Sequence, residues 1–237
     1  MSVELILKED VASHTLGELM VQLHYIPCDA ECVYLDKPCN LATIKKHLTN
    51  RSRRLFHVSI DGITYTSMRG KGFRSFSIEP TPVDSLSEID ELVKTLIPDE
   101  SLILARTYDP KYNHRQNEKQ LDMYEAHGWS TEGLTLKKSH LPPPLDTMEV
   151  DISNNPGRTQ LCDGYMEFVG NQMWFGDEFW KRSGLDRKVP DWWLEHSFQN
   201  GVDYYLFREQ PFTDDSPGVE LQDRIREFFF PPQTTAS

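Results

Sequence analysis

Apolar and polar residues alternate in the first third of the chain in a way that predicts antiparallel strands. The alternation runs over 55–60 and resumes over 63–68, with Asp61-Gly62 between the two segments. Asp-Gly favours a two-residue hairpin turn, because both turn positions must tolerate positive φ. Two glycines then break the chain before a further β-prone run at 73–78. We therefore predict that these three segments form an antiparallel meander.

A spacing of three or four residues between apolar positions predicts helices on either side of this meander. Over 86–97 the apolar residues form one continuous helical face, and Ser85 with Glu88 forms a capping box at its start. A second capping box predicts an earlier helix over 15–23, which follows a β-prone segment at 3–8. Strand and helix thus alternate before and after the meander.

Three further elements are expected in the same part of the chain. Asn40 is placed to cap a short helix over 41–48. The segment 101–108 contains an uninterrupted apolar run, which predicts a strand that is covered on both faces. A polar helix is expected over 110–127, ended by Gly128. Together with the meander, these elements predict helices layered on a sheet.

Shorter strands are expected beyond residue 141. A strand is predicted at 148–152, and another at 204–207. The segments 165–169 and 172–175 flank Gly170-Asn171 and read as a second hairpin. We therefore expect the second part of the chain to contribute antiparallel strands as well.

Helices are also predicted in this second part. Asp177 is expected to cap a short helix. Pro190 is expected to begin another, which carries Trp192 and Trp193 and is closed by Asn200-Gly201. Apolar residues at helical spacing over 221–228 predict a final amphipathic helix.

The pattern as a whole predicts an α+β fold, with mostly antiparallel sheet and helices packed on one face. Leu-Pro-Pro-Pro-Leu at 141–145 can extend neither a helix nor a central strand, because proline lacks the amide N–H and fixes φ. We take it as a connection between an α+β subdomain at 1–140 and an acidic, tryptophan-rich one at 141–237. One continuous domain remains the alternative.

Charge changes this picture most in the second part. The chain carries a net charge of −12, and residues 141–237 hold 17 acidic against 8 basic residues, a net of −9. An acidic surface repels phosphate backbones, which disfavours direct nucleic-acid binding, and it attracts basic partners. The alternative is that the acidic surface only keeps the protein soluble.

The ends and the cysteines bear on localisation and cofactors. The first residues have neither the basic region nor the apolar run of a signal peptide, and no window is apolar enough for a membrane span, so we expect a cytoplasmic protein. Of Cys28, Cys32, Cys39, His24 and His47, only the first pair has zinc-ligand spacing, which favours free thiols over a metal site. We predict no cofactor and no metal.

Signatures of catalysis are missing from the sequence. It contains no Gly-x-Ser-x-Gly, no phosphate-binding Gly-x-x-x-x-Gly-Lys-Ser/Thr and no His-Glu-x-x-His. Cys162 with His196 leaves a Cys/His hydrolase open as an alternative, and the cysteines at 28, 32 and 39 leave open a metal-dependent enzyme. No catalytic residue is predicted.

Tryptophans and acids are interleaved in the second part. Four of the five tryptophans lie within 174–193, with acidic residues between them. Aromatic anchors ringed by charge are typical of protein-binding sites, although at least two of these rings are expected to lie in a core. The predicted contact residues for a protein partner are Asp177, Glu178, Asp191, Trp192, Glu195, Asp214 and Asp215.

Two segments resemble bacterial immunity proteins of polymorphic toxin systems. They are Asn-Pro-Gly-Arg-Thr-Gln-Leu at 155–161 and Met-Trp-Phe-Gly-Asp-Glu-Phe-Trp at 173–180. The resemblance is to immunity family fifty-two, whose cognate toxins are restriction-endonuclease-like effectors of type VI secretion. It implies that the chain binds and neutralises a secreted toxin, a nuclease. The alternative within the same systems is an adaptor that recruits an effector for delivery.

Overall fold

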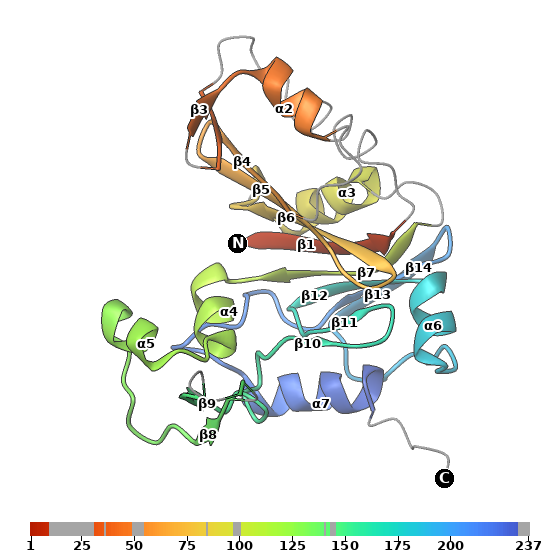
Figure 1. Cartoon of the computed structure of the whole chain (residues 1–237). Coiled ribbons are helices and arrows are strands. Elements are labelled where there is room, and N and C mark those ends of the chain that lie inside the picture. The colour runs from red at the N-terminus through yellow and green to blue at the C-terminus, as the bar shows by residue number, and fades with distance from the viewer. Residues whose placement is uncertain are drawn as a thin grey trace.

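A ten-stranded antiparallel sheet organises the computed structural model, which describes residues 1–9, 31–35, 37–48, 55–83, 85–96, 101–139, 141–142 and 146–231 (Figure 1). The strands lie in the order β13-β14-β12-β7-β1-β6-β5-β4-β2-β3. Their bounds are β1 Ser2–Lys8, β2 Cys32–Tyr34, β3 Lys37–Cys39, β4 Leu55–Ile60, β5 Ile63–Arg69, β6 Phe73–Glu79, β7 Leu102–Tyr108, β12 Gln172–Gly176, β13 Glu195–Gln199 and β14 Val202–Leu206. The α+β class with mostly antiparallel sheet is confirmed.

Short sheets and helices surround this sheet. The pairs are β8 Leu136–Lys138 with β9 Met148–Val150, and β10 Gln160–Leu161 with β11 Met166–Glu167. The described helices are α2 Leu41–Leu48, α3 Leu86–Leu96, α4 Pro110–Asn117, α5 Leu121–His127, α6 Asp177–Ser183 and α7 Val219–Phe229. None of these helices is long and apolar enough to cross a membrane. The helix expected over 15–23 lies outside the described residues.

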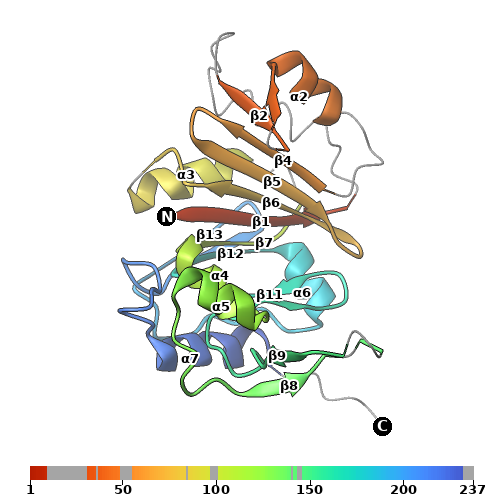
Figure 2. The same cartoon turned by 60° about the vertical axis from the view of Figure 1, so that its left-hand side comes forward.

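Helices cover both faces of the sheet, whereas one covered face was expected. One core holds the apolar face of α3 with Leu5 and Trp174, and the other holds α6 and α7 with Ile6 and Phe175. In Figures 1 and 2, α3 and α7 lie on opposite sides of β7 and β12. The physical reason is that neighbouring residues of the central strands point to opposite faces and are apolar on both.

Local signals in the first part produce the predicted elements. Asp61 and Gly62 have φ of 48° and 82°, and they turn β4 into β5. The Glu88 amide donates to Ser85 Oγ at 3.2 Å and the Ser85 amide donates to Glu88 Oε2 at 3.3 Å, so the capping box of α3 is formed. Asn40 Oδ1 accepts the Thr43 amide at 2.9 Å at the start of α2. These predictions are confirmed.

The polar helix expected over 110–127 is instead two helices, α4 and α5. The chain is extended at Glu118, with φ −75° and ψ 128°. The Glu118 carboxylate accepts the amides of Lys119 and Gln120, each at 2.8 Å, and the Lys119 carbonyl accepts the Val150 amide at 2.9 Å. The Glu118 carboxylate and β9 therefore form hydrogen bonds with backbone N–H and C=O groups that would bond within the helix if it were continuous.

The hairpin predicted around Gly170-Asn171 is wrong. β11 pairs with β10, while β12 enters the large sheet between β7 and β14. A Cβ at Gly170 would lie 2.5 Å from the carbonyl oxygen of Thr107, and Thr107 Oγ1 donates to Asn171 Oδ1 at 2.7 Å. Gly170 and Asn171 thus fit the chain against β7 and do not turn it back on itself.

The helix predicted from Pro190 is also wrong. Residues 195–199 form β13, and Asn200 and Gly201, with φ of 52° and 78°, form the two-residue turn into β14. Asn-Gly is a favoured hairpin turn, and here it acts as one and not as a helix end. Asp177 is the first residue of α6, whose N-cap is Gly176, so the predicted capping role is wrong as well.

The division at residue 141 stays a prediction, and two features of the sheet bear on it. The strands β8 and β9 on either side of the proline-rich segment pair with each other, and the Ser139 amide donates to the Thr147 carbonyl at 2.8 Å. β12, from the second part, pairs directly with β7, from the first. The large sheet therefore continues across the two parts.

Candidate functional site

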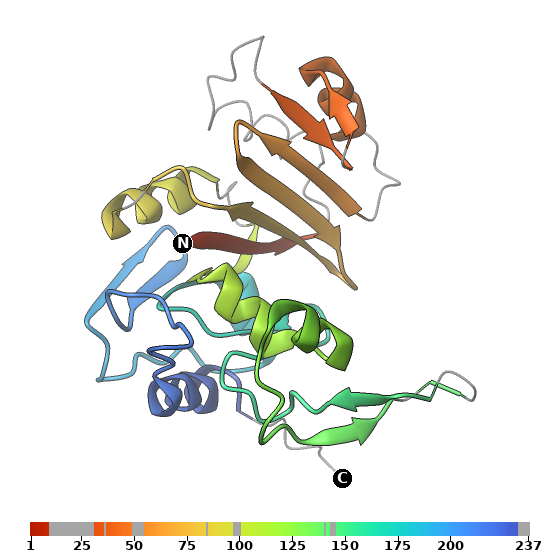
Figure 3. The same cartoon turned by 90° about the vertical axis from the view of Figure 1, so that its left-hand side faces the viewer.

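β13 is the last strand at one edge of the large sheet, so its outer side has no strand beside it among the described residues. The turn Asn200-Gly201 places Gln199 opposite Val202. In a hairpin with a two-residue turn, this flanking pair exchanges hydrogen bonds, and every second pair does the same. The N–H and C=O groups of His196 and Phe198 therefore point away from β14. The light-blue hairpin of β13 and β14 lies at the margin of the molecule in Figure 3.

The opposite edge of the sheet differs. β3 is a three-residue strand that contains Lys37 and Pro38. Short length, lysine and proline are the features by which natural edges avoid pairing with another chain. β13 has five residues and contains neither lysine nor proline. It is the edge that remains chemically able to accept another strand.

The side chains of β13 divide between the two faces. Ser197 lies opposite Tyr204 on the α3 side, while Phe198 lies opposite Asp203 on the α7 side. Phe198 is 55% exposed, and Leu194, directly before the strand, is 62% exposed. Two large apolar side chains thus lie in solvent at a sheet edge, where a partner could bury them.

A buried carboxylate holds this edge in place. Asp203 is 1% exposed, and it accepts Trp180 Nε1 at 3.2 Å, lies 3.3 Å from His196 Nε2 and pairs with Arg187 Nε at 3.1 Å. The Arg187 guanidinium also pairs with Asp177 and lies 4.7 Å from the centroid of the Phe198 ring. These contacts connect β13, β14 and α6, so the exposed edge is supported from behind.

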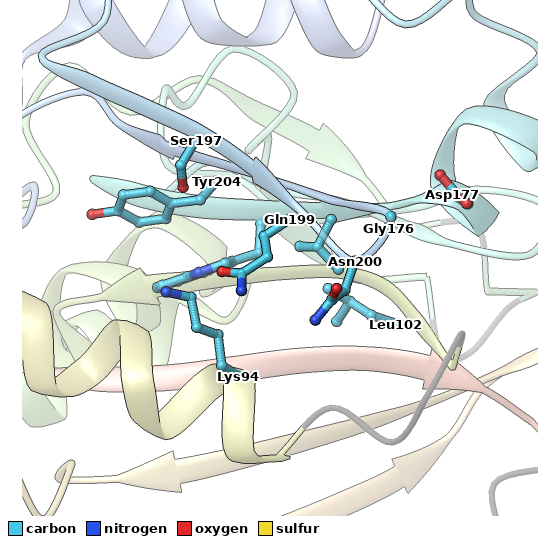
Figure 4. A pocket seen from close by; sticks show the side chains of 11 residues that line it. Lys94, Leu102, Gly176, Asp177, Ser197, Gln199, Asn200 and Tyr204 are labelled. Atoms are coloured by element: carbon cyan, nitrogen blue, oxygen red, sulfur yellow. The ribbon is translucent and has the colours of Figure 1, made fainter.

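A cleft of about 570 Å³ lies beside the edge, on the α3 side (Figure 4). It is lined by Trp174 and Val202, by Lys94 of α3, and by Gln199 and Asn200 of the hairpin. The walls therefore combine apolar surface with amide groups that can both donate and accept hydrogen bonds. Such a lining suits a polar side chain or a stretch of peptide.

Two ionisable groups that line this cleft, Lys94 and Tyr204, keep their ordinary protonation states near neutral pH. A hydrogen bond from Lys94 to Asp90, at 2.6 Å, is the main reason why the pKa of Lys94 is raised, so the amine stays charged. Burial raises the pKa of Tyr204 to about 12, so its hydroxyl stays protonated. Neither group is activated as a base or nucleophile near neutral pH.

Asp177 and Glu178, at the start of α6, differ in their availability. The Asp177 side chain is 55% exposed. The Glu178 side chain is 17% exposed and lies 3.5 Å from Lys8, 3.3 Å from Lys181 and 3.3 Å from Arg182. Burial raises the pKa of Glu178, but the hydrogen bonds from Lys181 and Arg182 outweigh it, and the net pKa is lowered. The Glu178 carboxylate therefore already has three cationic neighbours within the chain and is less available to a binding partner than Asp177.

Asp191, Trp192 and Glu195 lie along the approach to β13 and at its start. Asp191 and Glu195 are exposed. Trp192 is half-buried, with its ring 5.5 Å from that of Phe207 and with the Arg224 guanidinium 4.7 Å from its centroid. Asp191 and Trp192 therefore lie just before β13 in the chain, and Glu195 is its first residue; their role as a contact surface stays a prediction.

Asp214 and Asp215 lie elsewhere, in the loop between β14 and α7. Both are exposed, and Asp214 pairs with Arg115 of α4 at 3.1 Å. The predicted contact residues thus fall into three places: the start of α6, the approach to β13, and this loop. Of these, the approach to β13 also has the exposed apolar side chains and the open strand edge.

The tryptophans are divided as expected between core and surface. Trp174 and Trp180 are buried, at 1% and 8% exposure, in the two different cores, which confirms that at least two of the four rings are core residues. Trp192 and Trp193 are partly buried and pack at the margin of the α7 core. The latter pair lies nearer the surface, while buried Trp174 also lines the cleft beside β13.

The cysteines show no reactive arrangement among the described residues. Cys32 lies opposite Cys39 in the β2–β3 pair, while Cys28 lies outside the described residues. Burial raises the pKa of Cys162, which disfavours the thiolate, and the recorded contacts of His196 are with other residues: Asp203, Trp193 and Tyr205. Within the described ranges, no three or more His, Cys, Asp or Glu residues group as metal ligands.

The sequence pattern did not identify Ser197, Phe198 and Gln199 as surface residues of a strand, nor Leu194 as an exposed residue directly before it. It placed them on a helix, because four apolar residues at 192–198 match a helical face. The signal that identifies the strand is Asn200-Gly201, followed by the β-prone run that begins at Val202.

Comparison with protein-family models, with curated proteins and with solved structures gives no match to this chain. The resemblance to immunity proteins therefore stays a prediction.

Proposed function

We propose that this protein binds and neutralises a secreted protein toxin, a nuclease, in the cytoplasm by covering the toxin's active site or the approach to it. The observation that carries the proposal is the β13 edge, where exposed Phe198 and Leu194 lie beside exposed Glu195 and Asp191. An apolar centre with a charged rim is the usual composition of a protein-binding site.

Charge around the edge favours a basic partner. Residues 186–215, which lead into β13, through β14 and into the next loop, contain seven acidic and three basic residues. A nuclease must present positive charge to hold phosphates. Opposite charges on two surfaces raise the rate at which they meet, and a rapid encounter is what an inhibitor of a toxin needs.

Apolar burial would supply much of the affinity. Fully burying a Leu or Phe side chain contributes about 1.5–3 kcal/mol each. Leu194 and Phe198 are more than half exposed, so most of this contribution is still available to a complex. The Asp203 contacts hold the strand in place before binding, which lowers the ordering cost of association.

The test uses the protein encoded by the gene next to that of this chain. Co-expression should rescue cells from it, and the purified proteins should bind. Glu195→Lys should weaken binding about tenfold or more, because it replaces an attraction by a repulsion at the site. Glu132→Lys makes the same charge change at an exposed turn between α5 and β8 and should leave binding almost unchanged.

Two results would contradict the proposal. One is a chain that neither binds nor protects against the adjacent gene product. The other is delivery of the effector that depends on this chain, with no toxicity when the chain is deleted, which would identify an adaptor.

A further inference from the structure

We infer that the toxin supplies an extended, basic segment that adds to the large sheet as a strand beside β13. This inference rests on the proposed function and specifies how the partner is held. The first observation is the set of backbone groups at the edge: the N–H and C=O groups of His196 and Phe198 point away from β14. An extended segment can satisfy all four with backbone hydrogen bonds, which is the usual mode of β-strand addition.

The contrast between the two sheet edges favours such a use. β3 is short and carries Lys37 and Pro38, so it is protected against pairing. β13 has no such protection, although Phe198 makes it apolar enough to associate. Within the described part of the chain, β13 is thus an open edge on a sheet whose opposite edge is protected, which favours a partner strand for β13.

The side chains beside the edge provide a surface for an added strand. Successive side chains of that strand point to opposite faces. Those on the α3 side lie next to Ser197 and the mouth of the 570 Å³ cleft, whose amide groups can bind polar side chains, while the charged Lys94 amine disfavours a cationic one there. Those on the other side lie next to Phe198. Both faces of an incoming segment therefore meet side chains that suit them.

Charge complementarity identifies the occupant as basic. Glu195 lies at one end of β13, and Asp177 lies beside the Gly201 turn at the other, because a Cβ on Gly201 would be 3.0 Å from Asp177 Oδ2. A lysine or arginine at one end of an added segment would meet the Glu195 carboxylate, and one at the other end would share the half-exposed Asp177 carboxylate with Arg187. A second copy of this chain would instead place its own acidic residues next to these carboxylates. Like charges would then repel each other, and each copy carries a net charge of −12.

Proline at the edge tests the backbone hydrogen bonds. Phe198→Pro removes both the ring and the outward N–H, whereas Phe198→Ala removes only the ring. Because this N–H does not bond to β14, proline is compatible with the edge strand, and circular dichroism with thermal unfolding checks that both variants fold. Phe198→Pro should bind the toxin at least about tenfold more weakly than Phe198→Ala. Equal affinities of the two folded variants would overturn the inference.

Amide hydrogen exchange on the unmodified chain gives an answer that does not depend on any variant. In the complex, the amides of His196 and Phe198 should exchange at least about tenfold more slowly than in the free protein. The amide of Ser197, which bonds to β14, is the reference within the same strand. Unchanged exchange at both positions in a saturated complex overturns strand addition and leaves toxin binding intact.

Two other outcomes would also overturn the inference of strand addition. Protection of these amides in the free protein that increases with protein concentration would assign the edge to a second copy and overturn the inference. A toxin that does not bind the unmodified chain at all would remove the proposed function and this inference together.

Discussion

Asp203 is the residue on which the geometry of the β13 edge most depends. Its carboxylate is buried and receives contacts from Trp180, Arg187 and His196, which come from α6, the segment after it and β13. A buried charge is stable only when it is paired and hydrogen-bonded, so these partners and the carboxylate require one another.

Removal of this carboxylate should destabilise the protein and loosen the edge. We expect Asp203→Ala to lower the free energy of unfolding by about 2–4 kcal/mol, because Trp180 and Arg187 lose their acceptor. Arg187 is partly exposed and can regain water, which keeps the loss below that of a fully buried pair. Urea unfolding at neutral pH measures the change. Asp186→Ala, at an exposed position nearby, should change it by less than about 0.5 kcal/mol.

Some residue roles were accessible from the sequence and others were not. The exposure of Glu195 and Asp191 is the usual expectation for charged residues. The burial of Glu178 among Lys8, Lys181 and Arg182 does not, because Lys8 comes from a strand 170 positions earlier in the chain. The sequence does not indicate that Asp203 is a buried acceptor, because its partners come together only when β13, β14 and α6 are assembled.

At the scale of elements, local chemistry predicted those whose signals lie within a few residues. The Asp61-Gly62 turn and the capping box of α3 are of this kind. The pairing of β12 with β7 and β14 is not, because its nearest sequence neighbour, β11, looks like an equally good partner. Gly170 and Gly176 fit against β7 only through close backbone contacts, which sequence patterns do not reveal.

Gly176 provides a direct test of the β7–β12 contact. A Cβ at this position would lie 2.1 Å from the Leu102 carbonyl oxygen, so Gly176→Ala must displace backbone. We expect a loss of about 3 kcal/mol or more in the free energy of unfolding. Gly184→Ala, where φ is +69° but no atom lies within 4 Å of the Cβ, should cost about 1–2 kcal/mol from backbone strain alone. Equal losses in the two variants would contradict the close contact.

At the scale of the whole molecule, the sheet joins both parts of the chain and has two dissimilar edges. The protected edge, β3, is in the first part. The open edge, β13, is in the second, where the net charge is −9. The composition indicates which part of the chain is acidic. The location of the open edge cannot be predicted from composition, because it depends on the order of the strands in the sheet.

The central claim is that the acidic β13 edge binds a basic protein toxin, and calorimetric titration tests it most directly. The purified chain should be titrated with the adjacent gene product at about 50 and 200 mM salt, because screening between these values weakens attraction between exposed charges. We predict one-to-one binding that weakens as salt rises, and a marked loss of affinity in Glu195→Lys but not in Glu132→Lys. No binding at low salt, or binding that Glu195→Lys leaves unchanged, would contradict the claim.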